Sequence, residues 1–386
     1  MKRALVAWTL AFGLGVTSCA LEAAPAASTQ PTQAPVAVTA STANEIQALL
    51  TKRQDALGSK DLKGFQATID LTRPALRRCQ QESFDIAARQ GFQRTTVKVA
   101  KVEPYAGTYV RAYVGDDQRG YQRLYFRREG SGWLYSEPLE NELGGDRSKT
   151  VGGLALTYYG IDEDIIDVYA AAGNAARTFV AKQAEGHTTT GASFGLRIFP
   201  TRGAAGPNVG CAVGGFHLPN VPSDPYIRLF SNILLLKPGL TEMSESAQSI
   251  VRHEALHWLQ DQFSPGITAR LGFWLTEGWP DYIGQSRTEG EKQRVVCTTP
   301  TPTFKQLEDG VLETPETPPE LPTQYYAFAN TMIEYLYVTF GPNAYWELMA
   351  VYKAGVDAKV NFPKVLNVTP EQFHSGWIAW AKKKLC

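Results

Sequence analysis

Apolar residues at spacings of three and four predict that the folded part of the chain begins with helices. One helix is expected from about residue 42 to Gly58, where glycine ends the pattern, and a short one over residues 61–69. Alternation of apolar and polar residues then predicts strands over residues 97–102, 109–114, 121–126 and 133–135. Helices followed by an antiparallel meander are typical of an α+β domain, here over residues 42–145.

The second half of the chain is expected to combine a small sheet with many helices. Residues 153–160 are predicted to be a connection, and residues 162–183 a helix. Further strands are expected over residues 194–199, 227–230 and 233–236, and further helices over residues 245–263, 280–285, 324–340, 344–352 and 370–384. The uninterrupted apolar run of residues 233–236 fits a buried central strand.

The first 41 residues do not follow either pattern. Lys2 and Arg3 precede an apolar run that is too short to span a bilayer, which is typical of a signal peptide over residues 1–18. Residues 19–41 are rich in alanine, proline and threonine and carry one charge, so they are expected to be a disordered tether.

Residues 16–19 resemble a bacterial lipobox. The resemblance implies that Cys19 is lipidated, and that the protein is anchored on an extracytoplasmic face of the bacterial cell envelope. The alternative is a plain secretory signal that is cleaved elsewhere.

The amino-acid composition excludes a fully disordered chain and argues against a nucleic-acid-binding protein. The chain has 386 residues, 44% of them hydrophobic, so disorder throughout is excluded and two domains with full cores are expected. Because 38 Lys and Arg balance 38 Asp and Glu, no basic surplus exists to bind a phosphate backbone. Nucleic acid is therefore not an expected partner.

Four cysteines remain besides Cys19, and an even number in an export compartment favours disulfides. They are Cys79, Cys211, Cys297 and Cys386. The sequence leaves all three connectivities open, but a bridge between the two halves of the chain is not the expected one.

The chemistry concentrates in the helix predicted over residues 245–263. It contains the pattern H-E-x-x-H, formed by His253, Glu254 and His257. A spacing of four places both imidazoles on one helical face, where their nitrogens can bind a single ion. Glu254 lies about 100° around the helix from His253, a position suited to a general base.

A second acidic motif follows at a defined distance. Glu277 comes 20 residues after His257 in the segment LTEGWPDY, and Asp281 follows it by four. Together with H-E-x-x-H this pattern resembles the gluzincin metallopeptidases of the peptidase MA-like type, over residues 160–386. The resemblance implies a zincin-like domain with Zn²⁺ bound by His253, His257 and Glu277, and with Asp281 orienting a ligand histidine. Pro280 requires Glu277 to lie at the very start of its helix.

The same resemblance implies a hydrolytic mechanism. Glu254 would accept a proton from a water that attacks a peptide bond, and the oxyanion would need a further donor. Tyr325 and Tyr326 are the candidates, because related peptidases use a tyrosine or histidine from a later helix. The strand over residues 233–236 would then be the edge that aligns an extended peptide, against the buried reading that its pattern favours.

The three remaining histidines are weaker candidates. His374 is a more distant candidate donor, His217 is expected in a loop, and His187 is expected to be solvated. None of them is expected to bind the metal.

The order of elements over residues 42–145 resembles the cone-shaped NTF2-like fold, which adds an accessory domain to the predicted zinc peptidase. Two alternatives remain open. One is a ligand-binding lipoprotein that uses the NTF2-like pocket, with the peptidase half as a scaffold. The other is a zinc hydrolase that acts on a substrate other than a peptide.

Overall fold

The computed structural model describes residues 37–92, 94–105, 107–187, 193–206, 209–211, 214–217, 225–269, 271–309, 321–355 and 357–386. The predicted signal peptide and Cys19 lie outside these ranges, as does most of the predicted tether. The tether was expected to reach residue 41, but helix α1 already begins at Ala40.

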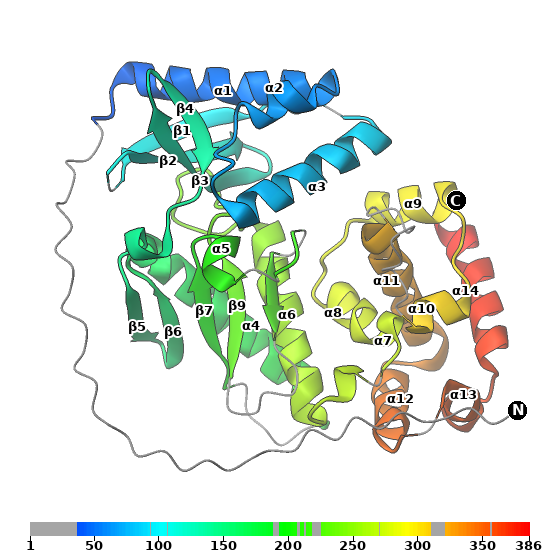
Figure 1. Cartoon of the computed structure of the whole chain (residues 1–386). Helices are drawn as coiled ribbons and strands as arrows, with labels where there is room; N and C mark the ends of the chain where they lie inside the picture. Colours follow the sequence, from blue (N-terminus) through cyan, green and yellow to red (C-terminus); the bar gives the residue numbers. More distant parts are fainter. Residues whose placement is uncertain are drawn as a thin grey trace, which may run out of the picture.

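The N-terminal part packs three helices against one antiparallel sheet (Figure 1). The helices are α1 (Ala40–Gly58), α2 (Leu62–Gln66) and α3 (Pro74–Gln90). The strands are β1 (Lys98–Pro104), β2 (Tyr109–Asp116), β3 (Gly120–Glu129) and β4 (Gly132–Ser136), in the order β1-β2-β3-β4. Helix α3 was not predicted, although Pro74 at its first turn and Gly91 at its end are ordinary helix boundaries.

A second sheet has five strands in the order β5-β6-β7-β9-β8. They are β5 (Asp146–Val151), β6 (Leu154–Tyr159), β7 (Gly195–Phe199), β8 (Gly215–His217) and β9 (Tyr226–Phe230). Strands β6, β7 and β9 run parallel, and the two outer strands pair antiparallel. The predicted α+β class is confirmed.

Two predictions about this sheet were wrong. Residues 153–160, expected as a connection, contain β6, which forms a hairpin with β5. Residues 233–236 are not a strand, because the backbone turns at Phe230, whose carbonyl accepts from the N–H of both Ile233 and Leu234. Leu234 and Leu236 are nevertheless almost fully buried, which explains why this apolar run resembled a core strand.

Apart from the two sheets, the described chain is mostly helical, and most of its helices follow the second sheet in sequence (Figure 1). Helices η2 (Gly160–Ile165), α4 (Ile166–Ala184) and α5 (Arg202–Ala205) lie between its strands in sequence, and η1 (Glu140–Glu142) precedes it. The others are α6 (Glu245–Phe263), η3 (Ile267–Ala269), α7 (Phe273–Thr276), α8 (Gly278–Ile283), α9 (Glu289–Thr298), α10 (Phe304–Asp309), α11 (Leu321–Phe340), α12 (Asn343–Lys353), α13 (Ala358–Leu366) and α14 (Pro370–Leu385). Within the described ranges, no helix has both the length and the apolar character to cross a membrane.

A buried ion pair joins the first sheet to the short helix η2, which follows strand β6. Arg123 of β3 donates from Nη1 to Asp162 Oδ1 of η2 at 2.8 Å, and both side chains are fully buried. The Ser231 hydroxyl donates to the same Asp162 oxygen at 2.7 Å. Beside this pair, Tyr121 and Leu236 exchange two backbone hydrogen bonds of 2.8 and 2.9 Å. We call these contacts the seam between the two halves.

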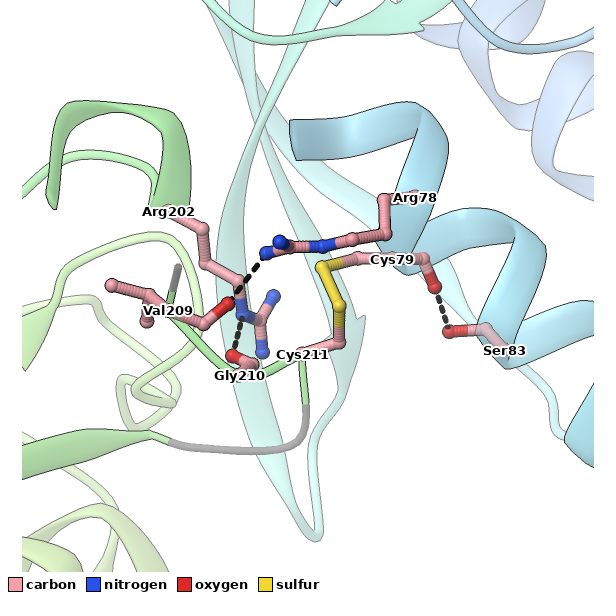
Figure 2. The surroundings of a disulfide bond; sticks show 7 residues. All are labelled: Arg78, Cys79, Ser83, Arg202, Val209, Gly210 and Cys211. Carbon is pink, nitrogen blue, oxygen red and sulfur yellow. Dashed lines mark hydrogen bonds between the residues drawn. A yellow bond between two sulfur atoms is a disulfide. The ribbon is translucent and has the colours of Figure 1, made fainter. Parts of the chain in front are cut away.

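A disulfide adds a covalent link between the halves. Cys79 of α3 is bonded to Cys211, which precedes β8 in sequence, and a second disulfide joins Cys297 to Cys386. Figure 2 shows Arg78 Nη2 donating to the Val209 carbonyl at 2.6 Å beside the first bridge. The expectation that no disulfide would connect the halves was wrong, because α3 was not foreseen and it carries Cys79 to the loop before β8.

Candidate active site

Helix α6 presents both histidines of the H-E-x-x-H pattern on one face. Ser244 caps the helix by accepting from the Ala247 N–H at 3.2 Å, so the helix starts where the sequence predicts. His253 and His257 follow one turn apart, and their Nε2 atoms lie 3.1 Å from each other. These two nitrogens point to the same spot.

Glu277 completes a group of three candidate ligands. It occupies the junction between α7 and α8, so it stands at the start of a helix as Pro280 requires. Its Oε2 lies 3.3 Å from His253 Nε2 and 3.2 Å from His257 Nε2. In the described part of the chain, these three residues form the group of His, Cys, Asp or Glu side chains that is close enough to hold one metal ion.

The distances between the three candidate ligand atoms match those around a bound zinc ion. Tetrahedral zinc with bonds of about 2.0–2.1 Å places its ligand atoms about 3.3–3.4 Å apart. The observed separations of 3.1–3.3 Å are close to that value. Two imidazoles and one carboxylate are also donors that zinc favours, so the residues fit a zinc ion with a fourth position open.

The charges of Glu277 and the two histidines shift the pKa values of Glu277 and His257. Burial alone would lower the pKa of His257, but the Glu277 carboxylate beside it outweighs burial and raises that pKa to about 9. Burial opposes ionisation of Glu277, yet the two imidazoles hold its pKa well below the usual range. Glu277 is therefore ionised near neutral pH, as a metal ligand must be.

Gln260, which sequence reasoning missed, fixes the orientation of His257. Its amide nitrogen donates to the Thr276 carbonyl at 3.1 Å and to the Tyr345 hydroxyl at 2.8 Å. The amide oxygen is thus left to accept from His257 Nδ1, at 2.9 Å. Because Nδ1 then carries the proton, Nε2 of a neutral His257 offers its lone pair to the metal position. Gln260 follows His257 by three on the same helix, a spacing that could have revealed it.

We expect replacement of Gln260 by leucine to lower zinc affinity by about 10- to 100-fold, because the imidazole loses the acceptor that fixes its tautomer. Gln248→Leu is the matched control: Gln248 lies on the same helix, donates to the Met243 carbonyl at 3.0 Å and does not line the cavity, so its variant should bind zinc as tightly as wild type. Competition with a chromophoric chelator measures both dissociation constants, and equal affinity of the leucine variant and wild type would contradict this role.

Glu254 lies beside the triangle and not within it. With His253, His257 and Glu277 it lines a cavity of about 350 Å³, whose other walls are Gly215, Phe216, His217, Thr268, Thr276 and Tyr326. Burial raises the pKa of Glu254, against the opposing influence of the two imidazoles. A carboxylate with a raised pKa is a stronger base than an ordinary glutamate.

The two candidate tyrosines differ in position. Tyr326 lines the cavity, and its hydroxyl hydrogen-bonds Glu277, while burial raises the pKa of Tyr326 well above its usual value. Tyr325 is 5% exposed and packs in the hydrophobic core. The structure therefore brings Tyr326 to the candidate site and keeps Tyr325 away from the cavity.

Asp281 lies on α8, one turn after Glu277, and is 2% exposed. Its Oδ2 accepts from Arg287 Nε at 2.8 Å and from Asn330 Nδ2 at 3.0 Å. Burial raises the pKa of Asp281, and the charges of Arg287 and then His253 oppose that rise. The side-chain hydrogen bonds of Asp281 therefore go to Arg287 and Asn330.

The three other histidines have different surroundings. His217 is in strand β8 and not in a loop, and it lines the cavity. His374 hydrogen-bonds the Pro302 carbonyl at 3.0 Å, away from the site. His187 was expected to be solvated; it is half-buried, and one face of its ring stacks on Trp346 with centroids 4.5 Å apart.

Comparison of the chain with models of protein families and with curated proteins gives no match. The function is therefore inferred from the residues and geometry of the site.

Proposed function

We propose that this protein is a zinc-dependent hydrolase that cleaves peptide bonds, with His253, His257 and Glu277 as metal ligands and Glu254 as general base. The observation that carries the proposal is the triangle of ligand atoms 3.1–3.3 Å apart with a buried glutamate beside it in one cavity. A site that only stored metal would have no need of a base there.

The residues around the cavity have separate tasks in this reaction. A zinc ion, when bound, supplies a Lewis acid that polarises the substrate carbonyl and acidifies water. Glu254 accepts a proton from the attacking water and returns it to the leaving amine, so the carboxylate is regenerated. Tyr326 donates its hydroxyl hydrogen to Glu277 and so helps to hold that ligand in place.

The position of strand β8, at an edge of the sheet and beside the cavity, favours a peptide as the substrate. It is the outermost strand of its sheet and pairs antiparallel with β9, and all three of its residues line the cavity. An extended peptide can pair with such an edge through its backbone. We therefore assign to β8 the aligning role that the resemblance to gluzincins implied for residues 233–236, against their sequence pattern.

The test combines metal analysis with a search for substrates. We expect purified protein to hold one zinc ion per chain and to cleave members of a broad peptide library, with cleavage lost on chelation and restored by zinc. Elemental analysis and mass spectrometry of the library measure the two properties. Protein without zinc would contradict the ligand assignment, and protein with zinc but no cleavage would favour a substrate other than a peptide.

A further inference from the structure

The chain segment that leads into strand β8 is attached to helix α3 of the N-terminal half. Cys211 is bonded to Cys79, and the Val209 carbonyl accepts from Arg78 Nη2 at 2.6 Å (Figure 2). Arg78 and Cys79 are neighbours on α3, so a single turn of that helix holds both residues of the segment. The first link is covalent, and the second is a charge-assisted hydrogen bond, which is stronger than a neutral one.

Helix α5 lies against the same part of the N-terminal half. A Cβ atom on Gly203 would lie 3.8 Å from Ala75 Cβ of α3 and 3.4 Å from Glu137 Oε2, so α5 is in van der Waals contact with α3. From α5, Arg202 Nε donates to the Gly210 carbonyl at 3.2 Å (Figure 2). Residues 209–211 are therefore fixed against α3 both directly and through α5.

Strand β8 follows this attachment closely in sequence. Gly215 comes four residues after Cys211, so the chain between them spans at most about 14 Å. A Cβ atom on Gly215 would lie only 3.1 Å from Glu254 Cγ, so the start of β8 lies directly against the proposed base. The other end of β8 is held by α6, where His217 Nε2 is 3.0 Å from Asp261 Oδ2. The start of the strand is thus the end that the N-terminal half can position.

The backbone of β8 presents alternate residues to the outer edge of the sheet. The Phe230 N–H of β9 donates to the Gly214 carbonyl at 3.2 Å, so the backbone carbonyl of residue 214 faces β9. Because the backbone groups of successive residues in a strand point to opposite sides, those of Gly215 and His217 face the outer edge. A peptide that pairs with β8 would therefore bond Gly215 and His217, and the position of Gly215 would set where that peptide lies in the cavity.

We propose that helix α3, through the Cys79–Cys211 bridge, holds strand β8 in the position where a paired peptide presents its scissile bond to Glu254. The inference rests on the proposed hydrolysis and gives the N-terminal half a task in it. The bridge and Arg78 are positioning elements, because they act on the substrate through β8 and do not line the cavity.

The second disulfide provides a matched control. Cys79→Ser with Cys211→Ser removes the proposed positioning bridge, and Cys297→Ser with Cys386→Ser removes a bridge that does not involve the cavity. The two bridges span 132 and 89 residues, and the entropy of loop closure grows only with the logarithm of that length. Loss of either bridge should therefore destabilise the fold by a similar amount. Arg78→Ala is a milder second variant, which keeps both bridges and removes the hydrogen bond beside the first.

The first measurement uses a nested series of peptides that share one scissile bond cleaved by wild type. We expect all variants to keep one zinc ion per chain. The variant without the Cys79–Cys211 bridge should lose about tenfold in kcat/KM on the long peptides, mainly through a higher KM, which corresponds to one or two backbone hydrogen bonds to β8. On a peptide too short to reach β8 the loss should be less than about twofold. Arg78→Ala should change kcat/KM in the same direction by about two- to threefold, and the control should match wild type.

The second measurement needs no substrate. Hydrogen exchange of the Phe230 amide reports on the pairing of β9 with the start of β8, because this amide donates to Gly214. We expect exchange at least about tenfold faster without the Cys79–Cys211 bridge, and exchange as in wild type without the Cys297–Cys386 bridge.

Unchanged Phe230 exchange and unchanged kcat/KM on long peptides would overturn the inference, and Arg78→Ala decides the matter if the double variant does not fold. Equal losses on long and short peptides would also overturn it, because the bridge would then act on the metal or the base and not on alignment. Failure of the proposed function is seen separately, in wild type, which would bind no zinc or cleave no peptide. In that case the Phe230 exchange still decides whether the bridge fixes β8.

Discussion

Replacement of Glu254 with glutamine should lower kcat by about 10²- to 10⁴-fold while leaving one zinc ion per chain. Glutamine has the same shape but cannot accept the proton of the attacking water. Glutamine is also neutral, so it avoids the free-energy cost of burying a charge, which is what raises the pKa of Glu254. The substitution should therefore not weaken the fold. The ligand triangle does not include Glu254, so zinc affinity should change little.

Glu245→Gln is the matched control for this substitution. Glu245 lies in the first turn of the same helix, is 75% exposed, and pairs with Arg252 away from the cavity. Its variant should keep wild-type turnover. Elemental analysis and initial rates on a cleaved peptide compare the three proteins, and turnover by Glu254→Gln within tenfold of wild type would refute the assignment of the general base.

The second large effect is expected at the seam. Arg123→Ala should lower the free energy of unfolding by about 3–5 kcal/mol, because it leaves Asp162 buried without its cationic partner. Arg123 also donates to the Ile161 carbonyl and to Asp164, both at 3.2 Å, so several acceptors lose their donor at once. Urea denaturation with both disulfides intact measures the change.

A neighbouring ion pair provides the control. Arg147 pairs with Glu163 at 2.9 Å, and the two side chains are 52% and 47% exposed. Glu163 follows Asp162 on the same short helix, so the two acidic residues share one element but differ in burial. Arg147→Ala should change stability by less than about 1 kcal/mol. Equal effects of the two substitutions would show that burial is not what makes the Arg123 pair important.

The sequence predicted elements whose signal is local. Helix α6 was expected over residues 245–263, the range that it occupies, because its cap and its apolar spacing agree. The three candidate ligands were found for the same reason, since H-E-x-x-H lies on a single helix and Glu277 follows at a fixed spacing. Their convergence within 3.3 Å depends on the packing of α6 against α8, which spacing alone does not determine.

Signals that depend on tertiary contact were missed. Asp261 and His217 are 44 residues apart in sequence, and the residues that flank each of them form no pattern that predicts a contact between the two side chains. Strand β5 is exposed along most of its length, so it lacks the alternation that marks a half-buried strand. The apolar run of residues 233–236 was misread because burial in a turn and burial in a strand leave the same composition.

The seam has a consequence for how this protein can be divided. Arg123 and Tyr121 come from the first sheet, whereas Asp162, Ser231 and Leu236 come from the second part. A fragment that began after the first sheet would lack Arg123, the cationic partner of Asp162, and would expose the apolar surface that Tyr113 and Tyr121 cover. The N-terminal part is therefore not an exchangeable module, and substitutions at the seam in one half would select for compensating substitutions in the other.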